Sequence, residues 1–275
     1  MQNELKIGFI GGGNMAAALV GGLAVKLTSP SNIHVVDLNK DSLLRMETQF
    51  GVNTSLQIDQ ALANCDVIIL AVKPQQLRDV VTQLQGHLSG QLLLSIAAGI
   101  RAGDISRWLG GYDAIVRSMP NTPALISKGV TGMVAMAGVS AEQRQAADNI
   151  MRAVGATVWL DDEALIDSVT AVSGSGPAYV FYFIEAMQQA AAELGLNPEQ
   201  GKQLAIATFT GAAELAAQSA DAVAVLREKV TSKGGTTYAA LSSLEADGVK
   251  DAIVRAVKAA AARGKELGDE FGQQG

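Results

Sequence analysis

Three small residues near the N-terminus have the spacing of a phosphate-binding turn. Gly11, Gly13 and Ala16 fit the pattern G-x-G-x-x-A within the stretch GFIGGGNMAAALVGG. In such a turn the first glycine allows a tight bend, the second removes a side chain that would block a pyrophosphate, and the third small residue lets the next helix pack on the strand. The helix that starts there offers free backbone N–H groups to the phosphates. The spacing predicts a dinucleotide site; a glycine-rich turn without a ligand is the alternative.

A carboxylate follows the second apolar run, at a position that can distinguish between dinucleotides. Asp37 ends the segment HVVD, where a carboxylate hydrogen-bonds the ribose hydroxyls of NAD and repels a 2′-phosphate. Asn39 and Lys40 follow closely enough to favour a phosphate instead. The sequence leaves the choice between NADH and NADPH open, with some weight on NADH being usable. The alternative role for Asp37 is to cap the helix that follows.

The usual acid/base of nicotinamide-dependent dehydrogenases is missing. The chain has two histidines, His34 inside an expected strand and His87 at the end of an expected helix, and we expect both to be structural or solvent-facing. A substrate that arrives protonated, such as a cyclic imine, needs only orientation and hydrogen bonding.

The lone cysteine, Cys65, excludes an intrachain disulfide and a multi-cysteine metal site, and we expect a buried thiol and no metal.

Three further loops have the composition of a site for a small anion. AVKP, from Ala71 to Pro74, follows the end of an apolar run, where open parallel sheets bind ligands. MPNTPA, from Met119 to Ala124, holds Asn121 and Thr122 between two prolines. TSKGGTT, from Thr231 to Thr237, precedes a helix whose N–H groups could hold a carboxylate while a threonine hydroxyl faces the substrate. For each loop a purely structural role is the alternative, and for the last this is an N-cap.

The composition limits the partners. A formal net charge of -6, with scattered lysines and arginines, argues against nucleic acid. The start MQNELKIGF has no basic region followed by an apolar stretch, so we expect no signal peptide. The apolar run from Ala178 to Ile184 is too short to span a bilayer. We therefore expect a cytoplasmic protein without membrane contact, and its 275 residues suggest two domains.

The first 160 residues alternate strands with helices. The expected strands are Lys6–Ile10, Ile33–Val36, Val67–Ala71, Leu92–Ile96, Ala114–Ser118 and Gly129–Ala135. The expected helices are Ala16–Lys26, Lys40–Phe50, Asp59–Asn64, Gln75–His87, Ala102–Leu109 and Ala141–Ala153. This order predicts an α/β fold: a Rossmann-like, doubly wound, mostly parallel sheet in a dinucleotide-binding domain at 1–160.

The pattern changes near Asp161 to helices alone. A helix, a glycine-serine break and a long helix are expected first, then a helix from Asn197 and Pro198, and helices at Ala222–Val230 and Thr236–Arg263. Their alanine-rich stretches are apolar around much of the circumference, which favours burial against another subunit. An ordinary helix in the core of a monomer is the alternative. We expect an all-helical substrate and dimerisation domain at 161–275.

Six segments together resemble one enzyme family. GFIGGGNMA, AVKPQ, SIAAGI, VRSMPNTPA, VTAVSGSGPAYVF and TSKGGTT occur in the order seen in the pyrroline-5-carboxylate reductases, over nearly the whole chain. MPNTPA and SGSGPAY are far more specific than the nucleotide pattern. The resemblance implies reduction of 1-pyrroline-5-carboxylate to L-proline by hydride transfer from NADPH or NADH, the last step of proline biosynthesis. It also implies a homodimer formed through the C-terminal helices that assembles further, to a decamer.

The resemblance also implies site residues. Thr237 matches the threonine that orients the imine nitrogen. The implied substrate contacts are Ser232, Gly235, Thr236 and Thr237, to which the loop MPNTPA adds Asn121. The implied cofactor contacts are Ile10, Gly11, Gly12, Gly13, Asn14, Met15, Asp37, Ala71, Val72, Lys73, Pro74, Ala97, Ala98 and Gly99.

Two residues depart from the family pattern. Lys233 stands where the family commonly has proline, and we favour a solvent-facing lysine over one that attracts the substrate. Asp37 stands where NADPH-using relatives often have a small hydroxyl residue.

One rival function, a β-hydroxyacid dehydrogenase, ordinarily has a catalytic lysine in its central helix, and VSGSGPAYVFYF has none. Another, a non-catalytic NAD(P)-binding sensor, would have no reason to keep MPNTPA and GGTT.

Overall fold

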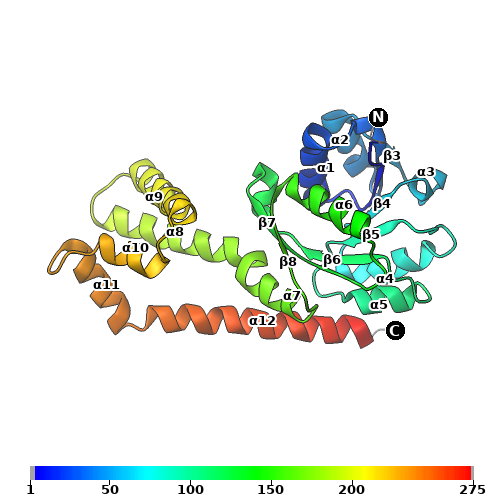
Figure 1. The fold of residues 1–275 in the computed structure, drawn as a ribbon. Helices are drawn as coiled ribbons and strands as arrows, with labels where there is room; N and C mark the ends of the chain where they lie inside the picture. Colours follow the sequence, from blue (N-terminus) through cyan, green and yellow to red (C-terminus); the bar gives the residue numbers. More distant parts are fainter. Residues whose placement is uncertain (1–3, 274–275) are drawn as a thin grey trace. The chain divides into compact units, whose positions relative to one another are not determined.

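The computed structural model describes residues 4–273, which form a sheet flanked by helices and then helices alone (Figure 1). The strands are β1 Ile7–Ile10, β2 Ile33–Val36, β3 Asn53–Ser55, β4 Val67–Leu70, β5 Leu92–Ser95, β6 Ile115–Met119, β7 Gly129–Ala135 and β8 Gly155–Trp159. The helices are α1 Asn14–Lys26, α2 Lys40–Phe50, α3 Gln60–Ala63, α4 Pro74–Gln83, α5 Ala102–Trp108, α6 Ala141–Arg152, α7 Leu165–Val169, α8 Gly176–Glu193, α9 Pro198–Gln218, α10 Val223–Lys229, α11 Thr236–Ala246 and α12 Val249–Gln273. The expected fold class is confirmed.

The sheet brings several strand ends to one edge. Its order is β3-β2-β1-β4-β5-β6-β7-β8, and every neighbouring pair is parallel except β6 and β7. The chain winds from β1 outward to β3 and then returns to β4 on the other side of β1. In the register Ile10 lies opposite both Val36 and Leu70, so the turns after β1, β2 and β4 start level with one another. Such a switch point is where open parallel sheets bind ligands.

Both faces of the sheet are covered, because successive side chains of a strand point to opposite faces. Phe9 and Ile69 pack in one core, with side chains of α1, α2 and α6. Ile10 and Ile68 pack in the other, with side chains of α4 and α5. This double burial explains why the strands are apolar without alternation.

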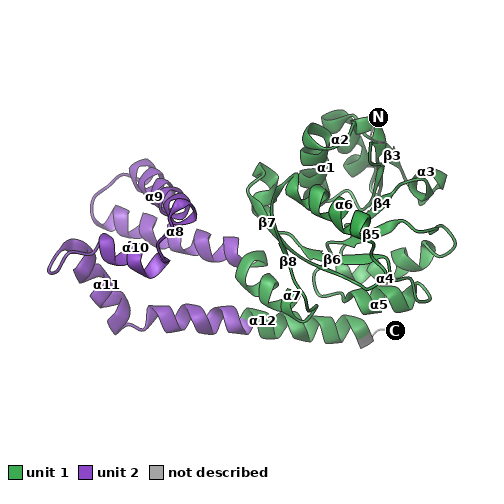
Figure 2. Cartoon of the chain, in the orientation of Figure 1, with its two compact units in different colours: residues 1–175, 260–275 green, residues 176–259 purple. Residues whose placement is uncertain are grey.

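The chain divides into two compact units (Figure 2). The first contains residues 1–175 and 260–275, and the second contains residues 176–259. In the second unit only Gly201 and Ala205 are buried, whereas Leu194 and Tyr182 are 84% and 73% exposed. No helix of the described residues 4–273 is both long and apolar enough to cross a membrane.

The elements differ from the sequence expectations at several points: the expected helix Gln75–His87 already ends at Gln83, and the expected glycine-serine break is a π-helical turn, Thr170–Gly174. β3 and β8 were not expected, because NTS is polar and GATVW begins with glycine and alanine, which are poor strand formers. The expected helix Thr236–Arg263 is two helices, α11 and α12, separated at Gly248, whose φ of +62° does not occur within a helix. The first unit also runs past residue 160 to Ser175 and takes in the end of α12.

A carboxylate on α6 holds β8 in place. Asp148 accepts hydrogen bonds from Thr157 Oγ1 at 2.7 Å and from Trp159 Nε1 at 3.0 Å. It also pairs with Arg152 Nε one turn along the helix. Partial burial raises the pKa of the Asp148 carboxyl, but the three hydrogen bonds outweigh this and hold the pKa below its usual value.

We expect Asp148→Asn to lower the free energy of unfolding by about 1 kcal/mol at neutral pH, because charge-assisted hydrogen bonds are lost. A carboxyl whose pKa is lowered by folding adds stability above its unfolded pKa and loses it as the pH falls through the folded pKa. The difference between the wild type and the variant should therefore shrink below about pH 4. Denaturation curves of the wild type and the variant, measured at neutral pH and below about pH 4, test this difference. Asp79→Asn, on the exposed side of α4, is the control and should change the free energy of unfolding little at either pH. If the difference in unfolding free energy between the wild type and Asp148→Asn does not change with pH, the role assigned to Asp148 is wrong.

Candidate cofactor and substrate sites

The turn after β1 is caught between the ends of its two neighbouring strands. Gly11 N–H donates to Val36 O of β2 at 2.8 Å, and Ala71 N–H after β4 donates to Ile10 O at 2.8 Å. The φ of Gly11 is +105°, and a Cβ at this position would lie 2.6 Å from Ala71 O. Only glycine meets both the dihedral angle and the available space.

The start of α1 is open where a pyrophosphate would lie. Gly13 is the N-cap and no side chain caps the helix, so the amides of its first turn have no partner within the helix. A Cβ added to Gly13 would meet nothing within 4 Å, and both Gly13 and Asn14 are exposed. An open helix start with its positive dipole end fits a dinucleotide phosphate.

Asp37 binds the glycine-rich turn and does not cap a helix. Its Oδ2 accepts from Gly12 N at 2.6 Å, and its Oδ1 accepts from Asn39 N at 2.8 Å. The cap of α2 is Asn39, whose side chain accepts from the amides of Asp41 and Ser42. The capping alternative for Asp37 is therefore excluded, and its half-buried carboxylate lies beside the turn.

The other expected cofactor loops share this edge of the sheet. Ala71–Pro74 connects β4 to α4, which starts at Pro74. Ala97–Gly99 follows β5, and Gly99 has a φ of +75°. A Cβ on Gly99 would lie 3.3 Å from the Phe271 ring, so the end of α12 covers this loop. The structure thus brings these loops, the turn and Asp37 together; their contacts with the cofactor stay a prediction.

The side-chain amide of Asn121 makes structural hydrogen bonds to the backbone at both ends. It is 8% exposed, its Nδ2 donates to Ser173 O at 3.1 Å, and its Oδ1 accepts from Val130 N at 2.9 Å. Ser173 belongs to a π-helical turn, Thr170–Gly174, that leads into α8. Asn121 therefore joins the end of β6 to the segment SGSG. A direct contact with substrate is still only predicted.

The loop TSKGGTT lies in the second unit and ends at an open helix start. Gly235 is the N-cap of α11 without a side-chain cap, and its N–H donates to Ser232 O at 3.0 Å. Gly234 has a φ of +74°, and a Cβ on Gly235 would lie 2.6 Å from Ser232 Oγ. Ser232, Lys233 and Thr236 are exposed, and Thr237 is half-buried in the first turn of α11. The alternative role of this loop, an N-cap by a serine or threonine side chain, is absent, so the first amides of α11 are free for a carboxylate.

Two groups near these sites were missed by sequence reasoning. Ser42 and Arg45 of α2 both contact the carbonyl of Gly12. Their spacing of three residues, on the helix after Asp37, puts them on one helix face and is the signal that could have found them.

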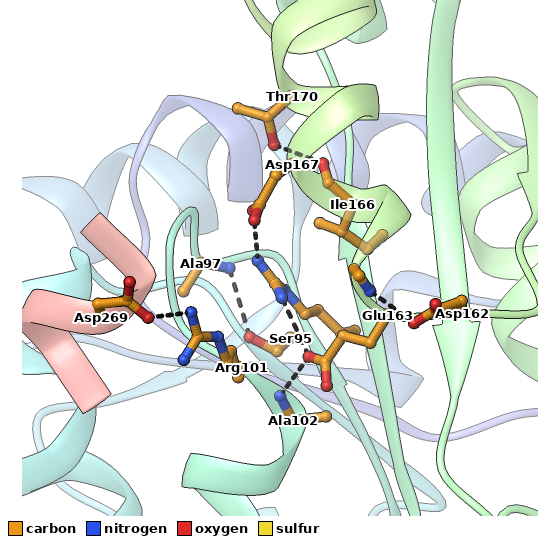
Figure 3. Close-up of polar contacts among 12 residues, drawn as sticks. Ser95, Ala97, Arg101, Ala102, Asp162, Glu163, Ile166, Asp167, Thr170 and Asp269 are labelled. Atoms are coloured by element: carbon orange, nitrogen blue, oxygen red, sulfur yellow. Dashed lines mark hydrogen bonds and ion pairs between the residues drawn. The ribbon is translucent and has the colours of Figure 1, made fainter. Parts of the chain in front are cut away.

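The second missed group is a buried ion cluster. Arg117 of β6, which is 3% exposed, pairs with Glu163 at 3.0 Å and with Asp167 at 3.7 Å. Glu163 also accepts from Ala102 N, and Asp269 pairs with Arg101 nearby (Figure 3). The signal is a lone arginine inside an apolar strand, which must find partners when buried.

The histidines and the cysteine supply no reactive group at the sites. His34 is 8% exposed in β2, with Nε2 3.2 Å from both Ser55 Oγ and Asp59 Oδ1, and His87 is exposed. Burial raises the pKa of the Cys65 thiol to about 11, so it stays protonated at neutral pH. Among residues 4–273 no cluster of His, Cys, Asp and Glu side chains could hold a metal ion.

Sequence comparisons place both halves of the chain among known families. Residues 163–267 match the family described as pyrroline-5-carboxylate reductase dimerisation, and residues 6–99 match the one described as NADP oxidoreductase, coenzyme F420-dependent. The pyrroline-5-carboxylate reductase of Pseudomonas aeruginosa is 43% identical over 269 residues, covering 98% of each chain. That of Arabidopsis thaliana is 37% identical and covers 96% of each chain.

Solved structures agree over the same length. A pyrroline-5-carboxylate reductase from Coxiella burnetii superimposes with a TM-score of 0.91 at 41% identity, covering 96% of this chain and 99% of that one. The Plasmodium falciparum pyrroline carboxylate reductase with NADP bound has a TM-score of 0.87 at 32% identity, covering 98% and 99%.

The position of Asp37 predicts a change in the choice of cofactor. Replacing it with Ser or Asn removes the charge that would repel a 2′-phosphate, so the ratio of the NADPH to the NADH dissociation constant should fall about tenfold, the equivalent of about 1.4 kcal/mol. Fluorescence titration with each cofactor measures the ratio. Asp37→Asn isolates the effect of the charge, because its amide oxygen can still accept the hydrogen bond from Gly12 N. A ratio unchanged in both variants would limit Asp37 to holding the turn.

Proposed function

The chain belongs to the pyrroline-5-carboxylate reductase family, and on this premise we propose that the two open helix starts described above form its cofactor and substrate sites. The protein is an NAD(P)H-dependent oxidoreductase that reduces 1-pyrroline-5-carboxylate to L-proline, the last step of proline biosynthesis. The observation that carries the assignment of sites is that α1 and α11 both begin without a side-chain cap. One lies in the turn after β1 and the other in the loop TSKGGTT.

The cofactor site is proposed at the carboxyl edge of the sheet, within residues 1–160. Gly11 to Met15 would bind the pyrophosphate through the start of α1, and Asp37 would bind the adenosine ribose. Ala71–Pro74 and Ala97–Gly99, at the ends of β4 and β5, would line the path toward the nicotinamide. This assignment is supported by the open space at Gly13 and by the position of these loops at the switch point of the sheet.

The substrate site is proposed at the start of α11, within residues 161–275. The amides of Gly235 and Thr236 would hold the substrate carboxylate at the positive end of the helix dipole, and Ser232 would contribute its hydroxyl. The Thr237 hydroxyl would orient the imine nitrogen. The exposure of Lys233 supports a solvent-facing ammonium group. A direct contact of Asn121 with substrate is the least supported part, because its amide already has two partners.

These residues position the reactants and transfer no proton of their own. When bound, NAD(P)H supplies the hydride that the imine carbon accepts. The C=N π electrons pass to nitrogen, and a ring nitrogen that is already protonated needs no acid. Holding both partners in near-contact geometry supplies much of the rate, since it replaces a bimolecular encounter by an oriented one. A threonine hydroxyl suffices for this task and a histidine is not needed.

The reaction predicts loss of nicotinamide absorbance with 1-pyrroline-5-carboxylate, measured in parallel with NADH and NADPH. We expect Thr237→Ala to lower kcat about thirtyfold, the equivalent of about 2 kcal/mol for one hydrogen bond to a charged group, with little change in the cofactor dissociation constant. Thr237→Ser keeps the hydroxyl and should retain most of the activity. An equal loss of cofactor binding in Thr237→Ala would count against the assigned role. If the wild type binds the cofactor but does not reduce 1-pyrroline-5-carboxylate, the non-catalytic NAD(P)-binding sensor becomes the better interpretation.

We also propose that this chain forms a homodimer through its C-terminal helices, that dimers assemble to a decamer, and that the protein works in the cytoplasm. The support for association is that the second unit buries only Gly201 and Ala205 and exposes many apolar side chains, which a partner would cover. The family matched by residues 163–267 is named for dimerisation.

The mass in solution tests the assembly. The chain has a mass of 28.5 kDa, and light scattering at micromolar concentration should give ten times this value. Ile206→Glu, on a half-exposed apolar position of α9, should reduce the mass because it places a charge in the proposed interface. A dimer in the wild type would reject the decamer and retain the dimer; a monomer would contradict both.

A further inference from the structure

The peptide group that follows Gly12 is held from outside the turn. Its carbonyl oxygen accepts from Ser42 Oγ at 2.6 Å and from Arg45 Nη2 at 2.9 Å. The preceding N–H of Gly12 is held by Asp37. Side chains at the end of β2 and on α2 therefore fix both sides of this glycine, which by itself has the widest backbone freedom of any residue.

Holding the Gly12 carbonyl determines the direction of the next N–H. The peptide bond is planar, and none of those in residues 4–273 is cis. In a trans peptide the C=O of Gly12 and the N–H of Gly13 point in opposite directions. Because the carbonyl points to α2, the Gly13 N–H points away from α2. Gly13 is exposed and a Cβ there would meet nothing within 4 Å, so this side is open to a ligand.

The helix that carries the two side chains is itself fixed. Leu43 and Met46 are buried against the sheet, and Asn39 caps the helix start. This leaves Ser42 half-buried and Arg45 exposed at the side of the helix that meets the turn. An exposed arginine gains little stability from such a bond, because ordering its long side chain costs entropy. The bond therefore adds little to the stability of the fold, and its main effect is on the orientation of the Gly12 carbonyl.

We propose that Ser42 and Arg45 are positioning residues for the cofactor: by holding the Gly12 carbonyl they aim the Gly13 N–H at the pyrophosphate. The positive charge on Arg45 also polarises this peptide group, which makes its N–H a stronger donor to an anion. The inference rests on the proposed assignment of the turn as the phosphate site. It extends the site to α2, through two side chains that do not touch the reacting groups.

A competing role for Arg45 is direct contact with the 2′-phosphate of NADPH, since Asp37 contacts the same glycine. The two roles differ in what they predict. A positioning residue acts on the pyrophosphate, which both cofactors share, and so affects NADH and NADPH equally. A 2′-phosphate ligand affects NADPH alone.

The test is Arg45→Met, compared with Lys128→Met, which removes one positive charge at an exposed position of the first unit. Arg45→Met should raise the dissociation constants of NADH and NADPH by a similar factor, about tenfold, the equivalent of about 1.4 kcal/mol. Ser42→Ala should give a smaller rise in both, and Arg45→Lys should restore part of the loss. The kcat at saturating cofactor and the KM for 1-pyrroline-5-carboxylate should change less than about twofold, which a general structural defect would not allow.

Three outcomes would overturn the inference: a loss confined to NADPH, an equal loss in Lys128→Met, or a fall in kcat at saturating cofactor. Gly13→Val separates this inference from the site assignment, since its side chain would fill the open side of the turn. If Gly13→Val leaves binding unchanged, the turn is not the phosphate site. If Gly13→Val weakens binding and Arg45→Met does not, the assignment stands and the role of α2 is rejected.

Discussion

The structure at the proposed cofactor site depends on the close approach of two backbones, at Gly11 and Ala71. β1 lies between β2 and β4, and its turn must leave the sheet where the next strand ends. A Cβ on Gly11 would lie only 2.6 Å from Ala71 O, so no side chain is admitted there. This contact sets where α1 begins, and hence where its free amides point. Of the residues that follow, Gly12 is constrained by α2, and Gly13 is left open to a ligand.

The second unit depends on a different constraint, which is the lack of a core of its own. Its helices bury only two small residues, so they cannot gain the burial energy that normally stabilises a helical domain. The loop from Thr231 to Thr237 is carried by these helices. The stability of the proposed substrate site would therefore depend on the proposed association that covers these helices, which would tie catalysis to assembly.

Much of the first unit could be predicted from the sequence, since short apolar runs bounded by glycine or polar residues form the buried strands of an α/β protein. Ile33–Val36, Lys40–Phe50 and Gly129–Ala135 were expected with the bounds that the structure has. β3 was not, because Asn53–Ser55 has no apolar pattern and pairs only as an edge strand. The break at Gly248 depends on one dihedral angle, which composition does not reveal.

The contacts of polar side chains were harder to predict than the elements that carry them. Asp37 lies at the end of β2 as expected, but which of two nearby side chains caps α2 depends on a difference of one or two residues in the helix start. The directions of the Ser42 and Arg45 side chains depend on how α2 packs beside the turn, which no local pattern reveals. The expectation of a buried Cys65 is confirmed, since burial in an apolar setting needs no specific partner.

The two charged side chains beside Gly12 illustrate how one turn can separate the choice of cofactor from the strength of its binding. The Asp37 carboxylate accepts two backbone hydrogen bonds beside the turn. Arg45 brings a positive charge to the carbonyl of the same glycine. A 2′-phosphate beside Asp37 would meet its negative charge, which at this half-buried position is screened in part by water and salt. On the proposed site Asp37 would therefore bias the choice of cofactor, whereas Arg45, acting through the peptide group after Gly12, would affect NADH and NADPH equally.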